Sequence, residues 1–188
     1  DSQHERLTES MIWADNRANQ YADLINEQYG GHDIYKRTGT PIHPMSPLSK
    51  IFWMKHEQPD IYQNTAMFAD IKTYIFYQLY GEYVIDHSMA SATGMFNLQQ
   101  LDWDQEALEL LGISASQLPQ LVPTTHILKG MKKRYATLMG IDENTPVVVG
   151  ASDGVLSNLG VNSYKKGEVA VTIGTSGAIR TVIDKPRT

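Results

Sequence analysis

Apolar and aromatic residues in the first half of the chain recur at helical spacing. Between residues 13 and 31 they predict a helix that stops at Gly30, with one face made of Ala18, Tyr21, Ala22, Ile25 and Tyr29. Residues 43–46 look like a loop before a helix that begins near Pro47, because proline suits the first helical position. Residues 69–81 predict another helix, which ends at Gly81 and has a face made of Ile71, Tyr74, Ile75, Gln78 and Leu79. We assign these aromatic-rich faces to the core and give no cofactor role to Tyr74, Phe76 or Tyr77.

Shorter elements follow, and the pattern changes near residue 145. Residues 82–86 predict a strand, residues 102–112 a compact helix with an acidic first turn, residues 121–130 a connector and residues 131–140 a further helix. The valine run at 146–150 predicts a buried strand, and residues 155–160 continue as a helix. Residues 167–184 alternate on either side of a Gly-Thr-Ser-Gly turn and predict a β-hairpin. The fold class is therefore α/β, with the helices concentrated early.

Composition narrows the range of functions. The 188 residues carry a net charge of −5 with scattered basic residues, so nothing indicates binding to nucleic acid or to an anionic membrane. The absence of cysteine excludes disulfides, zinc thiolate sites and thiol catalysis. No apolar run approaches a membrane span and no signal pattern opens the chain, so we expect a cytoplasmic enzyme. The chain begins without methionine and closes directly after a strand-like run, which suggests part of a longer protein.

Asp153 stands where the valine-rich strand turns into a helix, and three interpretations compete. It could cap the helix, a role worth about 1 kcal/mol. It could neighbour a hydrolase nucleophile, since Ser152 fits the G-x-S-x-G pattern. All six histidines precede Ser152, however, and the hydrolase triad places its histidine after the serine. The third interpretation makes Asp153 a catalytic base that faces a cleft.

The turn at residues 174–177 is a candidate phosphate cradle. Gly174 and Gly177 would let backbone N–H groups converge on an anion, and Thr175 and Ser176 would add hydroxyl donors. A plain hairpin turn favours the same residue types, so this signal alone is weak. An acid at a strand–helix junction about twenty residues before such a turn is more informative. Phosphoryl transfer to an alcohol needs a base for the hydroxyl proton and donors for the phosphates.

Several stretches together resemble the FGGY carbohydrate kinases. They are "MIWADNRA" from residue 11, "TGTPIHPMSPLSKIFWM" from residue 38, "YVIDHSMASATGMFNLQQLDW" from residue 83, and "GASDG" followed by "TIGTSGAI". The resemblance implies an actin-like, ribonuclease H-like ATPase fold of two domains that transfers phosphate from ATP, with Mg²⁺, to a sugar hydroxyl. It is strongest toward the branch that phosphorylates gluconate, with xylulose and glycerol as competing substrates.

The same resemblance implies roles for individual residues. Asp153 matches the catalytic base, and Gly174, Thr175, Ser176 and Gly177 match the hairpin that holds the nucleotide phosphates. Trp13 and Met45 match substrate-side positions, and Asp15 and Arg17 match a W-x-D-x-R segment that is a weaker substrate candidate. Trp13 could instead be core, Asp15 a helix-start acid and Arg17 a solvated base. His43 lies in the same loop as Met45 and could bind a substrate oxygen, but it is more simply a surface residue, and Lys50 is structural.

The chain also departs from the family pattern. It lacks the D-x-G-T-T turn that handles phosphate and magnesium, and it lacks the adenosine pocket. The resemblance implies that residues 1–163 are the latter part of the first domain and that residues 164–188 open the second. We expect these 188 residues to be inactive alone, to expose an apolar face that invites self-association, and to belong to a kinase that could form a homo-oligomer. An actin-like ATPase or chaperone relative and a non-catalytic sugar-binding module are the rival interpretations.

Overall fold

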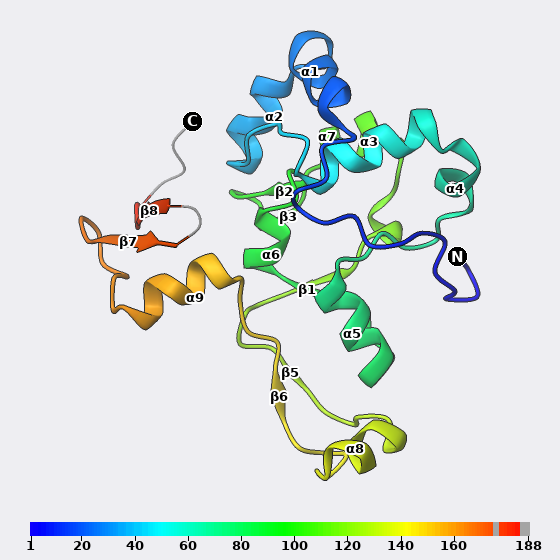
Figure 1. The fold of residues 1–188 in the computed structure, drawn as a ribbon, viewed down its shortest axis with the longest axis vertical. Coiled ribbons are helices and arrows are strands. Elements are labelled where there is room, and N and C mark those ends of the chain that lie inside the picture. Colours follow the sequence, from blue (N-terminus) through cyan, green and yellow to red (C-terminus); the bar gives the residue numbers. More distant parts are fainter. Residues whose placement is uncertain (175–176, 185–188) are drawn as a thin grey trace.

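The computed structural model describes residues 1–174 and 177–184, and Figure 1 shows an open arrangement of small α/β units. Helices gather around one end of the molecule: α1 (Asn19–Gln28), α2 (Gly31–Thr38), α3 (Pro47–Glu57), α4 (Pro59–Asn64) and α7 (Gln105–Leu111). They cover an antiparallel pair, β2 (Phe96–Asn97) and β3 (Asp102–Trp103). Their shared core includes the fully buried side chains of Ile25, Leu48, Leu108 and Leu111.

A second core lies around the central strands. β1 (Val84–Asp86) pairs in parallel with β4 (Gln120–Val122), and β5 (Ile127–Leu128) pairs antiparallel with β6 (Val147–Val148). The β5–β6 pair forms an arm that carries α8 (Lys133–Met139) at the far end of the molecule (Figure 1). The side chains of Phe76, Tyr80, Val84, Leu128 and Val149 pack together here, so α5 (Ile71–Tyr80) and both strand pairs share one core.

The elements of the candidate site are connected in sequence to the central strands. The short helix α6 (His87–Ser91) continues directly from β1, and α9 (Asp153–Gly160) follows β6. The antiparallel hairpin of β7 (Val169–Ile173) and β8 (Gly177–Thr181) then lies beyond α9 on one side of the molecule (Figure 1). A 3₁₀ turn, Ala115–Gln117, precedes β4.

Most predicted elements are confirmed. Helices occur at α1, α3, α5, α7, α8 and α9, a strand at β1 and a hairpin at β7–β8. Pro47 is the first residue of α3, and Gly81 ends α5 in a left-handed conformation. Gly30 both follows α1 and forms the left-handed cap of α2, a helix that the sequence did not predict. Helices α4 and α6 were missed as well, and the predicted connector at 121–130 contains the end of β4 and all of β5.

Two predictions about burial are wrong. The buried face of α5 is Thr73, Phe76 and Tyr80, whereas Ile71 and Ile75 are exposed. The hydroxyl of Thr73 explains this choice, because it donates to the carbonyl of Val84 at 3.0 Å and fixes that face against β1. The valine run is not uniformly buried either, because β6 pairs with β5 over two residues and only Val149 of the run is buried.

No helix within residues 1–174 and 177–184 is long and apolar enough to cross a membrane.

Candidate active site

Asp153 is the first residue of α9, and Ser152 holds the cap position before it. The Ser152 backbone is extended, and its side chain accepts from the Val155 N–H at 3.5 Å. The capping interpretation of Asp153 is therefore wrong. Asp153 is exposed, and its carboxylate accepts from the Gly154 N–H at 2.6 Å. An acidic residue in the first turn of a helix is favoured by the helix dipole, and Asp153 occupies that place at the start of α9.

The backbone before Asp153 is anchored on both sides. The N–H of Val149 donates to the carbonyl of His126 at 2.9 Å, and the N–H of Gly150 donates to the carbonyl of Thr124 at 3.0 Å. Gly150 then turns with a φ of 73°, a conformation that favours glycine. The N–H of Ser152 donates to the hydroxyl of Ser88 at 2.8 Å. The strand end and α6 thus fix the entry into α9.

Ser88 belongs to a buried polar cluster that the sequence did not reveal. Asp86 is fully buried and accepts from the N–H of Ser88 at 3.0 Å, from the N–H of Met89 at 3.1 Å and from the Ser88 hydroxyl. Its other oxygen accepts from Lys72 Nζ at 2.6 Å. Burial alone raises the pKa of the Asp86 carboxyl, but the bonds from Lys72, Ser88 and Met89 outweigh it and leave the pKa below its ordinary value. Asp86 is therefore a buried, charged anchor.

The β7–β8 hairpin lies beside the start of α9. Gly174 follows β7 and Gly177 opens β8, where it pairs with Ile173. Thr175 and Ser176 lie outside the described residues. Arg180 on β8 donates to the Thr172 hydroxyl at 3.2 Å.

The Arg180 guanidinium also reaches the residue next to Asp153. A Cβ added to Gly154 would lie 3.4 Å from Arg180 Nε. The structure thus brings the hairpin and the Asp153 turn together. The sequence analysis did not single out Arg180, and the signal available was its place three residues after the glycine turn.

Trp13 is 72% exposed, so its interpretation as a core residue is wrong. Lys50 holds the segment that contains Trp13. The Lys50 side chain is buried in α3, where its Nζ donates to the carbonyl of Ile12 at 2.5 Å, and burial lowers the pKa of its ammonium group. The structural role expected of Lys50 fits this contact, which presents Trp13 on the surface.

Asp15 and Arg17 form a close ion pair. Arg17 Nε lies 2.9 Å from both carboxylate oxygens of Asp15, and the Arg17 backbone N–H donates to the same group at 3.0 Å. These bonds from Arg17 lower the pKa of Asp15. The guanidinium carbon also lies 5.0 Å from the centroid of the Trp53 ring. α1 begins only at Asn19 and has no acidic residue in its first turn, so Asp15 is not a helix-start acid.

Met45 is 44% exposed in the loop before α3. Its N–H donates to His43 Nδ1 at 3.1 Å, so the His43 ring helps to shape this loop. Among the residues that the structure describes, no hydrogen bond or ion pair joins Met45, Trp13, Asp15 or Arg17 to Asp153. Within the described part of the chain, polar contacts therefore do not link the candidate substrate-side residues directly to the Asp153 turn.

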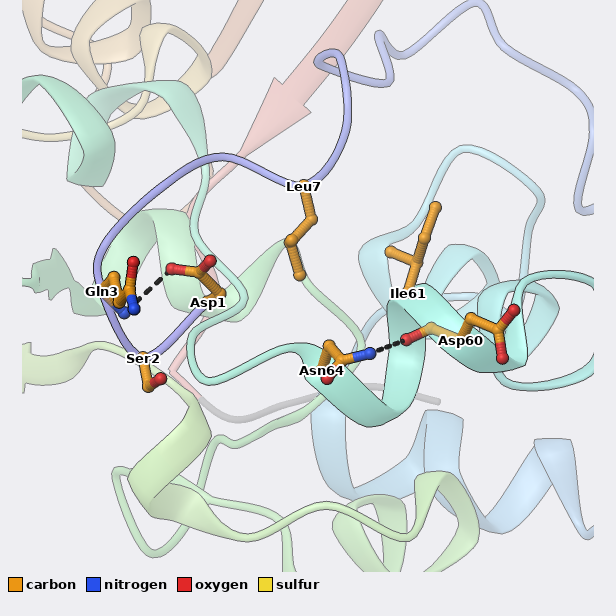
Figure 2. Close-up of a pocket in the computed structure, with 7 residues that line it drawn as sticks. All are labelled: Asp1, Ser2, Gln3, Leu7, Asp60, Ile61 and Asn64. Carbon is orange, nitrogen blue, oxygen red and sulfur yellow. Dashed lines mark hydrogen bonds between the residues drawn. The ribbon is translucent and has the colours of Figure 1, made fainter.

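Two hollows of the described surface are lined by residues other than Asp153. Figure 2 shows one of about 390 Å³ between the N-terminal segment and α4, lined by Asp1, Ser2, Gln3, Leu7, Asp60, Ile61 and Asn64. Its bonds, from the Gln3 N–H to Asp1 and from the Asn64 side chain to the Asp60 carbonyl, are local. A second hollow, of about 230 Å³, includes Arg17 and Trp53 in its lining. We give more weight to the Asp153 turn, because it combines a carboxylate, a cation and a glycine turn.

The described residues contain no group of three or more His, Cys, Asp or Glu side chains that could hold a metal ion.

Comparison with solved structures defines the class of the fold. The chain matches structures described as a gluconate kinase and as a ligand-bound xylulose kinase, both from Lactobacillus acidophilus, each with a TM-score of 0.96 and 40% identity. Each match covers 99% of this chain and 38% of the other. The chain thus has part of the actin-like ATPase fold of sugar kinases.

Residues 1–160 match the model for the N-terminal domain of the FGGY family of carbohydrate kinases, and the chain belongs to that family. It is 59% identical over 188 residues to gluconokinase from Bacillus subtilis strain 168, a match that covers all of this chain and 37% of the relative. The chain therefore spans about 37% of the length of that relative, in line with the expected segment of a longer kinase. The family match favours a kinase over the chaperone-type alternative.

Proposed function

We propose that the protein catalyses ATP-dependent phosphorylation of a sugar-acid hydroxyl, with D-gluconate converted to 6-phosphogluconate as the preferred reaction. The observation that carries this proposal is the 59% identity to a gluconokinase over all 188 residues. A second substrate, xylulose, is supported by the match to a ligand-bound xylulose kinase at 40% identity. A cytoplasmic location belongs to the same proposal, since both ATP and sugar acids are substrates of metabolism inside the cell.

Asp153 is the proposed general base. It lies exposed on the first turn of α9, so a sugar hydroxyl can approach its carboxylate. As the hydroxyl oxygen bonds to the γ-phosphorus of ATP and the bond from that phosphorus to the ADP oxygen breaks, the carboxylate would accept the hydroxyl proton. A positioned base contributes about 10²–10⁴-fold to such a reaction. The bond from the Gly154 N–H engages Oδ1, which leaves Oδ2 for the substrate.

The phosphates of ATP are proposed to lie at the β7–β8 turn, with contacts from Gly174, Thr175, Ser176 and Gly177. ATP would supply the phosphoryl group, and the residues of this chain would orient it. Arg180 supports this placement, because its guanidinium lies between the hairpin and Gly154. A cation at that point would stabilise negative charge on the phosphoryl oxygens during transfer. Mg²⁺ is expected to accompany ATP, and we propose no residue of this chain as its ligand.

The sugar is proposed to contact Trp13 and Met45, with Asp15 and Arg17 as weaker candidates. The exposure of Trp13 supports a ligand contact, because a side chain of this size is usually at least partly covered. The ion pair between Asp15 and Arg17 occupies both side chains, which favours a role in shaping the segment.

We propose the division into residues 1–163 of a first domain and 164–188 of a second on the resemblance to the family, and the match of residues 1–160 to the model for its N-terminal domain supports it. We also propose that these 188 residues are inactive alone, since they span only 37% of the length of the gluconokinase that they match. ADP formation by the 188 residues with ATP and gluconate would contradict this part of the proposal.

The experiment is a substrate panel. The full-length kinase is supplied with ATP and with gluconate, xylulose or glycerol, and ADP formation is followed with a coupled assay. The highest kcat/KM is expected for gluconate. A higher kcat/KM for xylulose or glycerol would support the proposed kinase activity but contradict gluconate as the preferred substrate. Sugar binding without ADP formation for any substrate would instead support the non-catalytic binding module.

A further inference from the structure

The hydroxyl of Ser88 connects the buried carboxylate of Asp86 to the backbone that carries Asp153. Ser88 lies on α6, 64 residues before Ser152 in the sequence. Its Oγ is hydrogen-bonded to Asp86 Oδ1 and lies 2.8 Å from the N of Ser152. Both serines are half-buried, so these bonds have limited competition from water.

The chemistry of the groups fixes the direction of both bonds. A charged carboxylate can only accept, so the single proton of the Ser88 hydroxyl points at Asp86. The lone pairs of the same oxygen then face Ser152, whose N–H can only donate. Lys72 holds the other oxygen of Asp86 at 2.6 Å, which balances the buried charge. The hydroxyl of Ser88 therefore has one stable orientation.

This orientation determines where α9 begins. Ser152 is the residue before Asp153, and its N–H is the last backbone donor before the helix. The strand end is held by Thr124, and Ser88 supplies the only side-chain bond to the backbone between Gly150 and Asp153 among the described residues. A base must lie close to the proton it accepts, and a misplacement of about 1 Å can cost roughly 10²-fold in rate.

We propose that Ser88 is a positioning residue for Asp153, which it places through the backbone of Ser152 with Asp86 as its anchor. The inference rests on the proposed kinase function. Ser88 touches neither substrate nor nucleotide in this account. Its loss is expected to change the placement of the base and to leave the sugar contacts near Trp13 and Met45 in place.

The test compares three variants of the full-length kinase with gluconate and ATP. Ser88→Ala removes the hydroxyl and is expected to lower kcat by about tenfold or more, with KM for gluconate within about twofold. Ser88→Thr keeps a hydroxyl and is expected to retain a kcat within about threefold of the wild type. The matched control is Ser91→Ala, because the Ser91 hydroxyl on the same helix donates to the Ser88 carbonyl at 2.8 Å and, among the described residues, makes no hydrogen bond to the Asp153 turn.

The outcomes separate the inference from the function on which it rests. A wild-type enzyme that phosphorylates no sugar would refute the proposed function itself. With an active wild type, a Ser88→Ala kcat within about twofold of normal overturns the positioning role. Three other outcomes would also overturn the positioning role, since Ser88 would then act through general stability. They are an equal loss of kcat in Ser88→Ala and Ser91→Ala, a Ser88→Thr enzyme as slow as Ser88→Ala, and a Ser88→Ala protein that is unfolded.

Discussion

Removal of Arg37 is expected to destabilise the protein far more than removal of its neighbour Lys36. Asp104 is 2% exposed, and it accepts from Arg37 Nε at 2.8 Å and from Arg37 Nη2 at 3.0 Å. Asn97 and the N–H of Ala107 each donate to the same carboxylate at 3.0 Å. The carboxylate thus joins α2 to the β2–β3 pair and caps α7.

The size of the effect follows from burial. Arg37→Ala leaves the Asp104 charge buried without its cation, and such losses cost about 3–5 kcal/mol. Two donors remain on Asp104, so we expect the lower end, about 3 kcal/mol. For a domain of this size that corresponds to a fall in melting temperature of roughly 6–12 °C. Lys36 pairs with Asp33 at 3.2 Å on the exposed side of the same helix, a contact worth about 0.5 kcal/mol or less.

Thermal denaturation followed by circular dichroism measures both changes. Arg37→Ala is expected to melt well below the wild type, and Lys36→Ala within about 2 °C of it. The double variant Arg37→Ala/Asp104→Asn gives a sharper test, because it removes the uncompensated charge and keeps an oxygen for the α7 cap. It should be more stable than Arg37→Ala alone. Equal melting of Arg37→Ala and Lys36→Ala, or a double variant less stable than Arg37→Ala, would refute the buried-charge reasoning.

Three further predictions use other parts of the chain. The pKa of both Asp86 and Asp104 is lowered in the folded protein. The stabilisation that these two carboxylates provide is therefore present above the unfolded pKa of about 3.9 and is lost as the pH falls through their folded pKa values. Urea midpoints should stay constant between about pH 7 and 5 and should drop below about pH 4. Gly39→Ala should cost about 1 kcal/mol or more in urea denaturation, because Gly39 has a φ of 70° and a Cβ there would lie 2.6 Å from Leu98 Cδ1, whereas Gly160→Ala, where a Cβ has open space, should be neutral or stabilising. Arg180→Ala should lower the kcat of the full-length kinase by about tenfold or more. The control Lys166→Ala removes an exposed ion pair with Asp184 in the same hairpin region and should leave kcat unchanged. Equal kcat values for the two variants would contradict a role for Arg180 in phosphoryl transfer.

The sequence was a good guide where local signals decide the structure. Gly81 and Pro47 mark the helix ends that the structure has, because a left-handed glycine and an N-terminal proline act within a single turn. The face of α5 was predicted wrongly because apolar and aromatic residues surround the helix on several sides. A tertiary bond from Thr73 to Val84 selects the buried face, and no helical period encodes it.

The candidate site was predictable in part for the same reason. Asp153 and the glycine hairpin could be found from motif and spacing, although their functional roles remain predictions. The contact of Ser88 with Ser152 joins residues 64 apart, and Arg180 meets Gly154 only when the hairpin lies beside α9. Neither contact leaves a periodic or compositional signal. The cap assigned to Asp153 as one alternative belongs to Ser152, a shift of one residue that only the backbone angles reveal.

The kinetics of Asp153→Asn in the full-length kinase test the central claim most directly. Asparagine keeps the size of the side chain and an oxygen for the Gly154 N–H, and it removes the proton acceptor. With gluconate and ATP, the account predicts a kcat lower by roughly 10²-fold or more and a nearly unchanged KM for gluconate. A kcat within about threefold of the wild type would contradict the assignment of Asp153 as the catalytic base.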